Sequence, residues 1–177
     1  MNSKLPKILL LLIVMNFDVG FSQKITPISI NNEIFELPGK WEIQGKNENS
    51  GQYAFNNKKL KNLLTISVRK ITNFEFYNQQ RDNIGLLNDY YDWETKYWTE
   101  NNTDLNVEVE KYIQDDENIF VIWRIKLIDK NLENFIIGGI RNGKLITISL
   151  TDNKDKPKTK EEIIKFLKDL YFSKTKI

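Results

Sequence analysis

The sequence predicts an α+β domain in which an antiparallel β-sheet of about six to eight strands carries one helix on each face, an α/β/α sandwich. Three observations predict this class. Eight short apolar or alternating runs, bounded by turn residues, lie between residues 34 and 151. Two other segments have the apolar spacing of amphipathic helices. Two of the strand segments are apolar on both faces, which is typical of strands in the middle of a covered sheet.

The first half of the chain carries four strand signals. The longest of them alternates, so that Leu64, Ile66 and Val68 would point to one face of the sheet and the polar residues between them to the other. A strand with this pattern is expected to be buried on one face only. The four predicted strands are Ile34–Leu37, Trp41–Gln44, Gln52–Phe55 and Leu63–Lys70.

The segment Asn73–Asn101 is predicted to form the first helix, with a bend at Gly85. Large apolar residues recur in it at spacings of seven, three, four and seven, which places them on one side of a helix with 3.6 residues per turn. This stripe is expected to face the sheet. It consists of Tyr77, Ile84, Leu87, Tyr91 and Trp98.

Four further strands follow in succession and predict an antiparallel meander. The dipeptide Asn142-Gly143 is a strong hairpin signal, because both residues tolerate the positive φ of a type I′ turn. The pair Gly138-Gly139 inside a strand indicates a bulge or the close approach of a helix. The predicted strands are Val107–Gln114, Ile119–Ile128, Phe135–Arg141 and Leu145–Thr151.

The last predicted element is a helix over Lys160–Phe172. Thr159 and Glu162 have the spacing of a capping box at its start. Its apolar residues lie on one face, which is expected to cover the side of the sheet opposite the first helix.

The N-terminus has the features of a secretory signal peptide. Lys4 and Lys7 precede the apolar run Ile8–Val14, and Gly20 and Ser22 are small residues in front of a cleavage point. We expect residues 1–22 to be a signal peptide and residues 23–177 to be a single exported domain, periplasmic or secreted. The apolar run is shorter than the ~20 residues that span a bilayer, so no stable membrane anchor is expected after cleavage.

Composition excludes several classes of chemistry. The 177 residues include no His and no Cys, which rules out a Ser-His-Asp triad, a thiol nucleophile, a Cys/His zinc site and a disulfide. We predict no cofactor and no metal centre. The formal net charge of +2 is too small to indicate nucleic-acid binding.

Carboxylate chemistry remains open, because a glycosidase needs only two acidic side chains. The predicted first helix contains Asp89, Asp92 and Glu94, for which a solvated helix face is the alternative. The cluster Asp115–Glu117 offers oxygen ligands for Ca²⁺ but lacks the spacing of a calcium loop, so a plain hairpin tip is the alternative. Trp41 and Trp123 fit a buried core or an aromatic platform for sugars.

The order of elements resembles the PsbP-like superfamily, which also includes the Ran-binding Mog import regulator and bacterial periplasmic relatives. The most specific pieces are Leu37-Pro38-Gly39-Lys40-Trp41, which is similar to the family's Pro-x-x-Trp entry, and the closing helix that runs into Phe172-Ser173. The resemblance implies this fold and a non-catalytic accessory or binding role. It carries no site residue over to this chain.

A second stripe on the first helix is the candidate binding site. Its spacings of four, three and four make it point nearly opposite to the first stripe, so it would form an exposed aromatic face for a protein partner or a small ligand. The alternative is that the loop Gly45–Asn62 covers it or that a break at Gly85 makes both stripes part of the core. The stripe consists of Leu86, Tyr90, Trp93 and Tyr97.

Two functions follow from these observations. The first is an exported non-catalytic binding or accessory protein of the bacterial envelope, with no catalytic residues. The second is a carboxylate-based glycoside hydrolase or a carbohydrate-recognition module.

Overall fold

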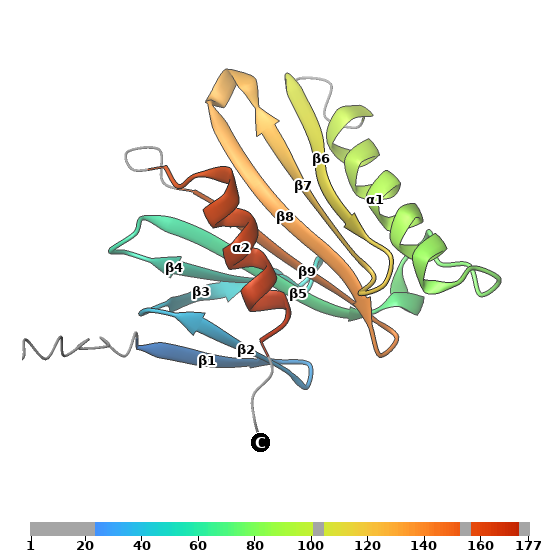
Figure 1. The fold of residues 1–177 in the computed structure, drawn as a ribbon, viewed down its shortest axis with the longest axis horizontal. Coiled ribbons are helices and arrows are strands. Elements are labelled where there is room, and N and C mark those ends of the chain that lie inside the picture. Colours follow the sequence, from blue (N-terminus) through green and yellow to red (C-terminus); the bar gives the residue numbers. More distant parts are fainter. Residues whose placement is uncertain (1–23, 101–104, 153–156, 174–177) are drawn as a thin grey trace, which may run out of the picture.

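The computed structural model describes residues 24–100, 105–152 and 157–173. In this part of the chain nine strands, two α-helices and two 3₁₀ turns follow one another (Figure 1). The strands are β1 (Ile25–Ile30), β2 (Glu33–Pro38), β3 (Glu42–Lys46), β4 (Tyr53–Asn57), β5 (Asn62–Lys70), β6 (Val107–Asp115), β7 (Phe120–Leu127), β8 (Leu132–Arg141) and β9 (Lys144–Thr151). The helices are α1 (Asn83–Glu100) and α2 (Lys160–Tyr171), and the 3₁₀ turns are η1 (Ile71–Asn73) and η2 (Ile128–Lys130).

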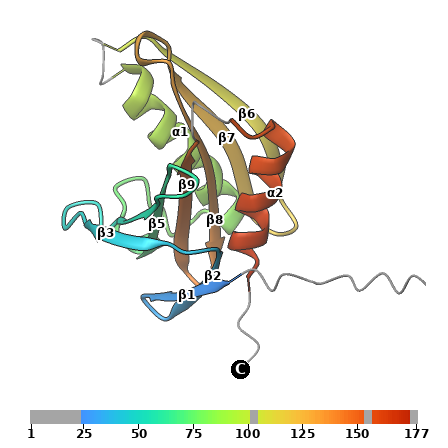
Figure 2. The same ribbon diagram turned by 90° about the vertical axis from the view of Figure 1, so that its left-hand side faces the viewer.

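Seven strands form one antiparallel sheet in the order β3-β4-β5-β9-β8-β7-β6, and β1 and β2 form a separate hairpin. Helix α1 lies on one face of the sheet, over β6, β7 and β8, and α2 lies on the other face (Figures 1 and 2). The predicted α+β sandwich is therefore confirmed. The predicted meander is also present, with Asn142 (φ 52°) and Gly143 (φ 69°) in the turn between β8 and β9.

The sequence patterns missed strand β1. Pro27 lies in it, and proline lowers the expectation of a strand because it cannot donate to a ladder. Strand β1 pairs with β2 alone among the described strands, so the missing N–H at Pro27 can be accommodated on its free edge. Ile28 and Ile30 pack against the core on the α2 side.

The first helix is shorter than predicted, because it starts at Asn83 rather than at Asn73. The Asp82 carboxylate accepts a 2.7 Å hydrogen bond from the backbone N–H of Gly85, which satisfies a free donor of the first turn. Gly85 is thus part of the first turn and not a bend, and Tyr77 lies outside the helix.

Two separate cores lie on the two faces of the sheet. The core under α2 joins residues of both sheets to the helix and includes Phe35, Ile122 and Leu167. The core under α1 is smaller and includes Leu87 and Trp123. The predicted capping box is present at α2: Thr159 Oγ1 accepts from the Glu162 N–H (3.2 Å), and a Glu162 carboxylate oxygen accepts from the Thr159 N–H (2.8 Å).

Gly138 and Gly139 let both helices approach the sheet. A methyl group on Gly138 would lie 2.5 Å from Cε1 of Tyr90, which belongs to α1. A methyl group on Gly139 would collide with Tyr171 of α2 and lie 2.9 Å from the backbone oxygen of Ile119. Adjacent residues of a strand face opposite sides, so each glycine makes room for one aromatic side chain. The predicted close approach of a helix is confirmed on both faces.

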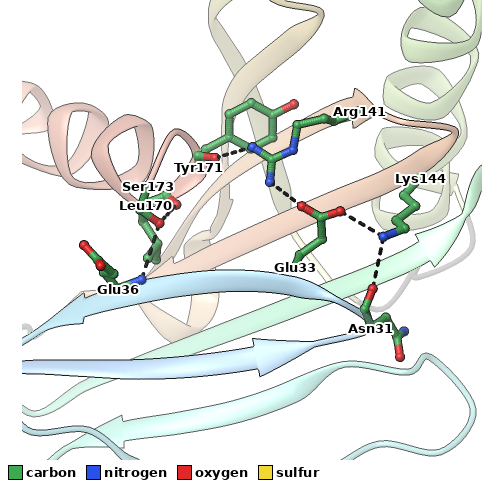
Figure 3. A network of polar contacts seen from close by, with 8 residues as sticks. All are labelled: Asn31, Glu33, Glu36, Arg141, Lys144, Leu170, Tyr171 and Ser173. Atoms are coloured by element: carbon green, nitrogen blue, oxygen red, sulfur yellow. Dashed lines mark hydrogen bonds and ion pairs between the residues drawn. The ribbon is translucent and has the colours of Figure 1, made fainter. Parts of the chain in front are cut away.

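A polar network joins the β1–β2 hairpin to the main sheet (Figure 3). The Glu33 carboxylate accepts from Arg141 Nη2 (2.8 Å) and from Lys144 Nζ (2.9 Å), which lie on either side of the β8–β9 turn. Arg141 Nη1 also donates to the backbone oxygen of Tyr171 at 3.1 Å. Burial alone would raise the pKa of Glu33, but the hydrogen bonds and charges of Lys144 and Arg141 lower it overall.

Candidate functional site

A cleft of about 430 Å³ lies between α1 and the half of the sheet that α1 leaves uncovered. On this face β7 presents apolar residues such as Trp123 and Ile125, which α1 and its surroundings bury. Strands β9 and β5, which lie beyond β8 in the sheet, present polar residues instead. The helix therefore covers the apolar half, and the polar half becomes the floor of an open cleft. Its polar floor residues are Thr65, Ser67, Arg69, Asn134, Thr147, Ser149 and Thr151.

Strand register places the floor hydroxyls side by side. Thr65 lies opposite Ser149, and their hydroxyls are 2.7 Å apart. Ser67 lies opposite Thr147, whose hydroxyl shares a 3.2 Å hydrogen bond with that of Tyr90. Each hydroxyl can both donate and accept, so the floor offers a row of adaptable hydrogen-bonding groups.

The wall formed by α1 combines aromatic rings with one carboxyl group. Trp98 donates from Nε1 to a carboxylate oxygen of Glu94 at 3.1 Å, one turn earlier in the helix. Burial raises the pKa of Glu94, and the hydrogen bond from Trp98 offsets this only in part. Trp93 lines the same cleft, and its Nε1 donates to Glu75.

Arg69 lies at the foot of this wall. Its guanidinium stacks over the ring of Phe74, with Cζ 4.5 Å from the ring centroid. Phe74 also lines the cleft and packs edge-on against Trp93, with the two ring centroids 6.2 Å apart. The residues just before α1 thus connect the end of β5 to the helix wall.

The predicted binding stripe does not form one exposed face. Leu86 (4% exposed) and Tyr90 (2%) are buried, so the expected exposure is wrong for these two residues. Phe76 covers this side of α1, with its ring centroid 5.8 Å from that of Tyr90 and 5.7 Å from that of Trp93. Part of the stripe is thus core, as in the alternative, but the cover comes from the segment before α1 rather than from the loop 45–62.

The remaining members of that stripe lie in different surroundings. Trp93 is half-buried beside the cleft, and Tyr97 is 48% exposed with its ring edge-on to Trp98. Tyr90 reaches the floor of the cleft through its hydroxyl. The structure thus brings Tyr90 and Trp93 together in the cleft and leaves Leu86 and Tyr97 out of its lining.

The candidate carboxylates do not gather at one site. Asp89 pairs with Arg81 (3.3 Å), Asp92 is exposed, and among the described residues that line the cleft Glu94 is the single carboxylate. Asp115 accepts from the backbone N–H of Asn118 at 2.9 Å, which makes residues 115–118 a hairpin tip. No group of three or more acidic side chains within the described ranges is placed to hold a metal ion.

Trp41 and Trp123 are core residues rather than a platform for sugars. Trp41 donates from Nε1 to the backbone oxygen of Pro38 (3.0 Å) and packs against Phe166. Trp123 is fully buried beneath Tyr90 and Tyr91.

The cleft residues Ser67 and Thr147 were not singled out as site residues by sequence reasoning, and Trp98 was predicted only as part of the stripe that faces the sheet. The alternation in β5 and β9 does place Ser67 and Thr147 on a polar face. Their meeting, however, depends on the pairing of β5 with β9, which joins segments about 80 residues apart.

Comparison with known proteins defines the fold. No family model matches the chain, and no curated protein matches it in sequence. The structure is similar to cyanobacterial PsbP from Synechocystis sp. PCC 6803, with a TM-score of 0.56 at 13% identity over 84% of this chain and 90% of that one. The chain therefore has a PsbP-like fold, as its order of elements predicted.

A protein of unknown function from Pseudomonas aeruginosa is less similar. The TM-score is 0.34 at 14% identity, over 74% of this chain and 84% of the other, which is too low to indicate a shared fold. The predicted signal peptide (residues 1–22) lies outside the described residues. Within the described part, neither helix is long and apolar enough to cross a membrane.

Proposed function

We propose that the protein is an exported, non-catalytic binding protein of the bacterial envelope that holds a small, hydroxyl-rich ligand in the cleft beside α1. The observation that carries this proposal is the pairing of a hydroxyl-lined floor with an aromatic wall in a cavity of about 430 Å³. Cavities of roughly 300–1,000 Å³ are usual for small-molecule sites.

The two surfaces of the cleft suit the two kinds of surface on a sugar. Trp93 and Trp98 offer flat apolar rings to its C–H face. Thr147, Ser149 and Thr151 offer donors and acceptors to its hydroxyl groups. Carbohydrate recognition is therefore assigned to this cleft and not to Trp41 and Trp123, which are buried.

The absence of a second carboxylate favours binding over hydrolysis. Glycoside hydrolysis requires two acidic groups across the bound sugar, about 5 to 9.5 Å apart. Glu94 is the single carboxylate among the described residues that line the cleft, and the chain has neither His nor Cys to replace a partner. The features of a signal peptide in residues 1–22 support export to the periplasm or the medium.

The test is a titration of the purified protein with D-galactose and N-acetyl-D-glucosamine, followed through the indole N–H signals of the tryptophans in NMR spectra. We expect saturable shifts at Trp93 and Trp98 but not at the buried Trp41. In Ser149→Leu, the added side chain fills the floor, and binding should fall by at least about 10-fold.

The matched control is Ser29→Leu, because Ser29 is an exposed strand residue remote from the cleft lining. It should leave binding unchanged. Thermal melts of both variants check that each is folded. Equal affinity of the folded Ser149→Leu variant and the unchanged protein would show that the cleft is not the site.

A further inference from the structure

Arg69 differs from the other arginines in its partners. The chain contains four arginines, and three of them have carboxylate partners: Arg81 with Asp89, Arg124 with three glutamates and Arg141 with Glu33. No carboxylate of the described residues lies within ion-pair distance of the Arg69 guanidinium. This unpaired group is also the one that lines the cleft.

The surroundings hold the Arg69 side chain in place without neutralising it. The guanidinium stacks on Phe74, and the stem passes Gly51, where a methyl group would lie 3.6 Å from Cδ of Arg69. A stacked guanidinium keeps its N–H groups free for in-plane hydrogen bonds. Ser67, two residues earlier on the same face of β5, brings a hydroxyl to the same end of the cleft.

We propose that the ligand is an acidic sugar, whose carboxylate is held by Arg69 and Ser67 and whose hydroxyl groups lie along the rest of the floor. This inference rests on the proposed function, because it names the ligand class of the same cleft. Guanidinium and carboxylate form paired, charge-assisted hydrogen bonds, which are stronger than those between neutral groups.

The charges of the cleft favour a carboxylate over a phosphate. Arg69 is the single cation among the described residues of the lining. One guanidinium balances the single charge of a carboxylate, whereas a phosphate ester carries about 1.5 to 2 negative charges near neutral pH. Glu94 is the acidic group of the α1 wall, and its carboxylate already accepts the indole N–H of Trp98.

The test compares D-galacturonate with D-galactose, which differ only in having a carboxylate or a hydroxymethyl group on the ring. We expect galacturonate to bind at least about 10-fold more tightly in isothermal titration calorimetry at pH 7, the effect of one charge-assisted hydrogen-bond pair. In Arg69→Gln this preference should disappear, because the variant lacks the guanidinium that pairs with the carboxylate.

The matched control is Arg81→Gln, because Arg81 already pairs with Asp89 and does not line the cleft. It should preserve the preference for galacturonate. Thermal melts establish that both variants are folded, and the indole N–H signals of Trp93 and Trp98 report binding in the cleft.

The outcomes separate this inference from the proposed function. If both sugars bind equally well, and Arg69→Gln does not change this, the proposal of an acidic sugar is overturned. The proposed function as a sugar-binding cleft then still stands. Tighter binding of galactose 6-phosphate than of galacturonate would overturn the proposal that the acidic group of the ligand is a carboxylate. Failure of all these sugars to shift Trp93 or Trp98 would overturn the proposed function as well.

Discussion

The two faces of the seven-stranded sheet are covered to different extents. On the α2 side, the helix and the β1–β2 hairpin close one core that runs from Phe35 and Trp41 across to Phe120. On the α1 side, the helix covers the apolar residues of β7 and β8 and stops where Thr147 and Ser149 begin. The α2 side therefore buries the larger apolar core, and the α1 side leaves a polar surface uncovered beside the helix.

The polar groups of the two regions show the same contrast. At the closed side, Glu33 forms ion pairs with Arg141 and Lys144, and these pairs join the hairpin to the sheet (Figure 3). At the open side, Arg69 stacks on a ring and Glu94 receives one indole N–H. Groups that are already paired stabilise the fold, whereas groups left with spare hydrogen-bonding capacity in a cleft are available for recognition.

The largest expected effect comes from adding a methyl group at Gly139. In Gly139→Ala the methyl meets Tyr171 and the backbone oxygen of Ile119, neither of which can move without disturbing the closed core. We expect a loss of about 3 kcal/mol in the free energy of unfolding, the upper range for overpacking. Guanidinium denaturation measures it.

The matched change on the open face is Gly138→Ala. Its methyl meets the ring of Tyr90 and lies 3.3 Å from that of Trp123, and its nearest contacts include no backbone atom. Tyr90 also borders the cleft, so we expect a smaller loss of about 1 kcal/mol. Equal losses for the two variants would contradict the idea that the α1 side is the more adaptable face.

A smaller effect is expected at the closed polar network. Glu33→Gln removes the charge that pairs with Arg141 and Lys144, and should cost about 1 to 2 kcal/mol at pH 7. Because the pKa of Glu33 is lowered on folding, its contribution is complete above the ordinary value of 4.5 and is lost as the pH falls through the lowered pKa. Denaturation curves from pH 7 down to pH 3 should therefore show the variant and the unchanged protein converging.

Glu36→Gln is the matched control on the same strand. Its side chain forms no ion pair with the described residues, so Glu36→Gln should change the free energy of unfolding at pH 7 by less than about 0.5 kcal/mol. A constant difference between Glu33→Gln and the unchanged protein at every pH would show that the hydrogen bonds, and not the charge, provide the stabilisation.

The sequence predicts most of the fold because its local signals agree with the tertiary structure. Alternation in β5, the Asn142-Gly143 turn and the Thr159–Glu162 capping box each identify an element without reference to the rest of the molecule. The predicted start of α1 was wrong because Tyr77 lies seven residues before Ile84 and so continues the apolar stripe of the helix, although it lies outside the helix. Phe74 and Phe76 show how this segment is arranged, since they fold back onto Tyr90 and Trp93.

The site was less predictable because it depends on contacts between distant segments. Trp93 was singled out from its helical position, but its neighbours Ser67, Arg69 and Thr147 come from strands whose pairing the patterns do not define. The solvent exposure of the second stripe on α1 could not be predicted either. Periodicity shows which residues share a side of a helix but not whether another segment covers that side.

The smallest expected effect tests the open face through Glu94. Burial raises the pKa of its carboxyl group, so above the ordinary value of 4.5 ionisation costs more in the folded chain than in the unfolded one. Glu94→Gln retains an oxygen acceptor for the indole N–H of Trp98 and removes this cost. We expect it to be more stable at pH 7 by roughly 0.5 kcal/mol, the scale of a partly solvated substitution.

The gain in stability of Glu94→Gln should fade as the pH falls through the raised pKa and vanish below 4.5. This change in stability has the opposite sign to that of Glu33→Gln, and thermal melts from pH 4 to pH 8 measure it. Loss of stability in Glu94→Gln at pH 7 would mean that the folded protein stabilises the ionised carboxylate of Glu94, as Arg141 and Lys144 stabilise that of Glu33.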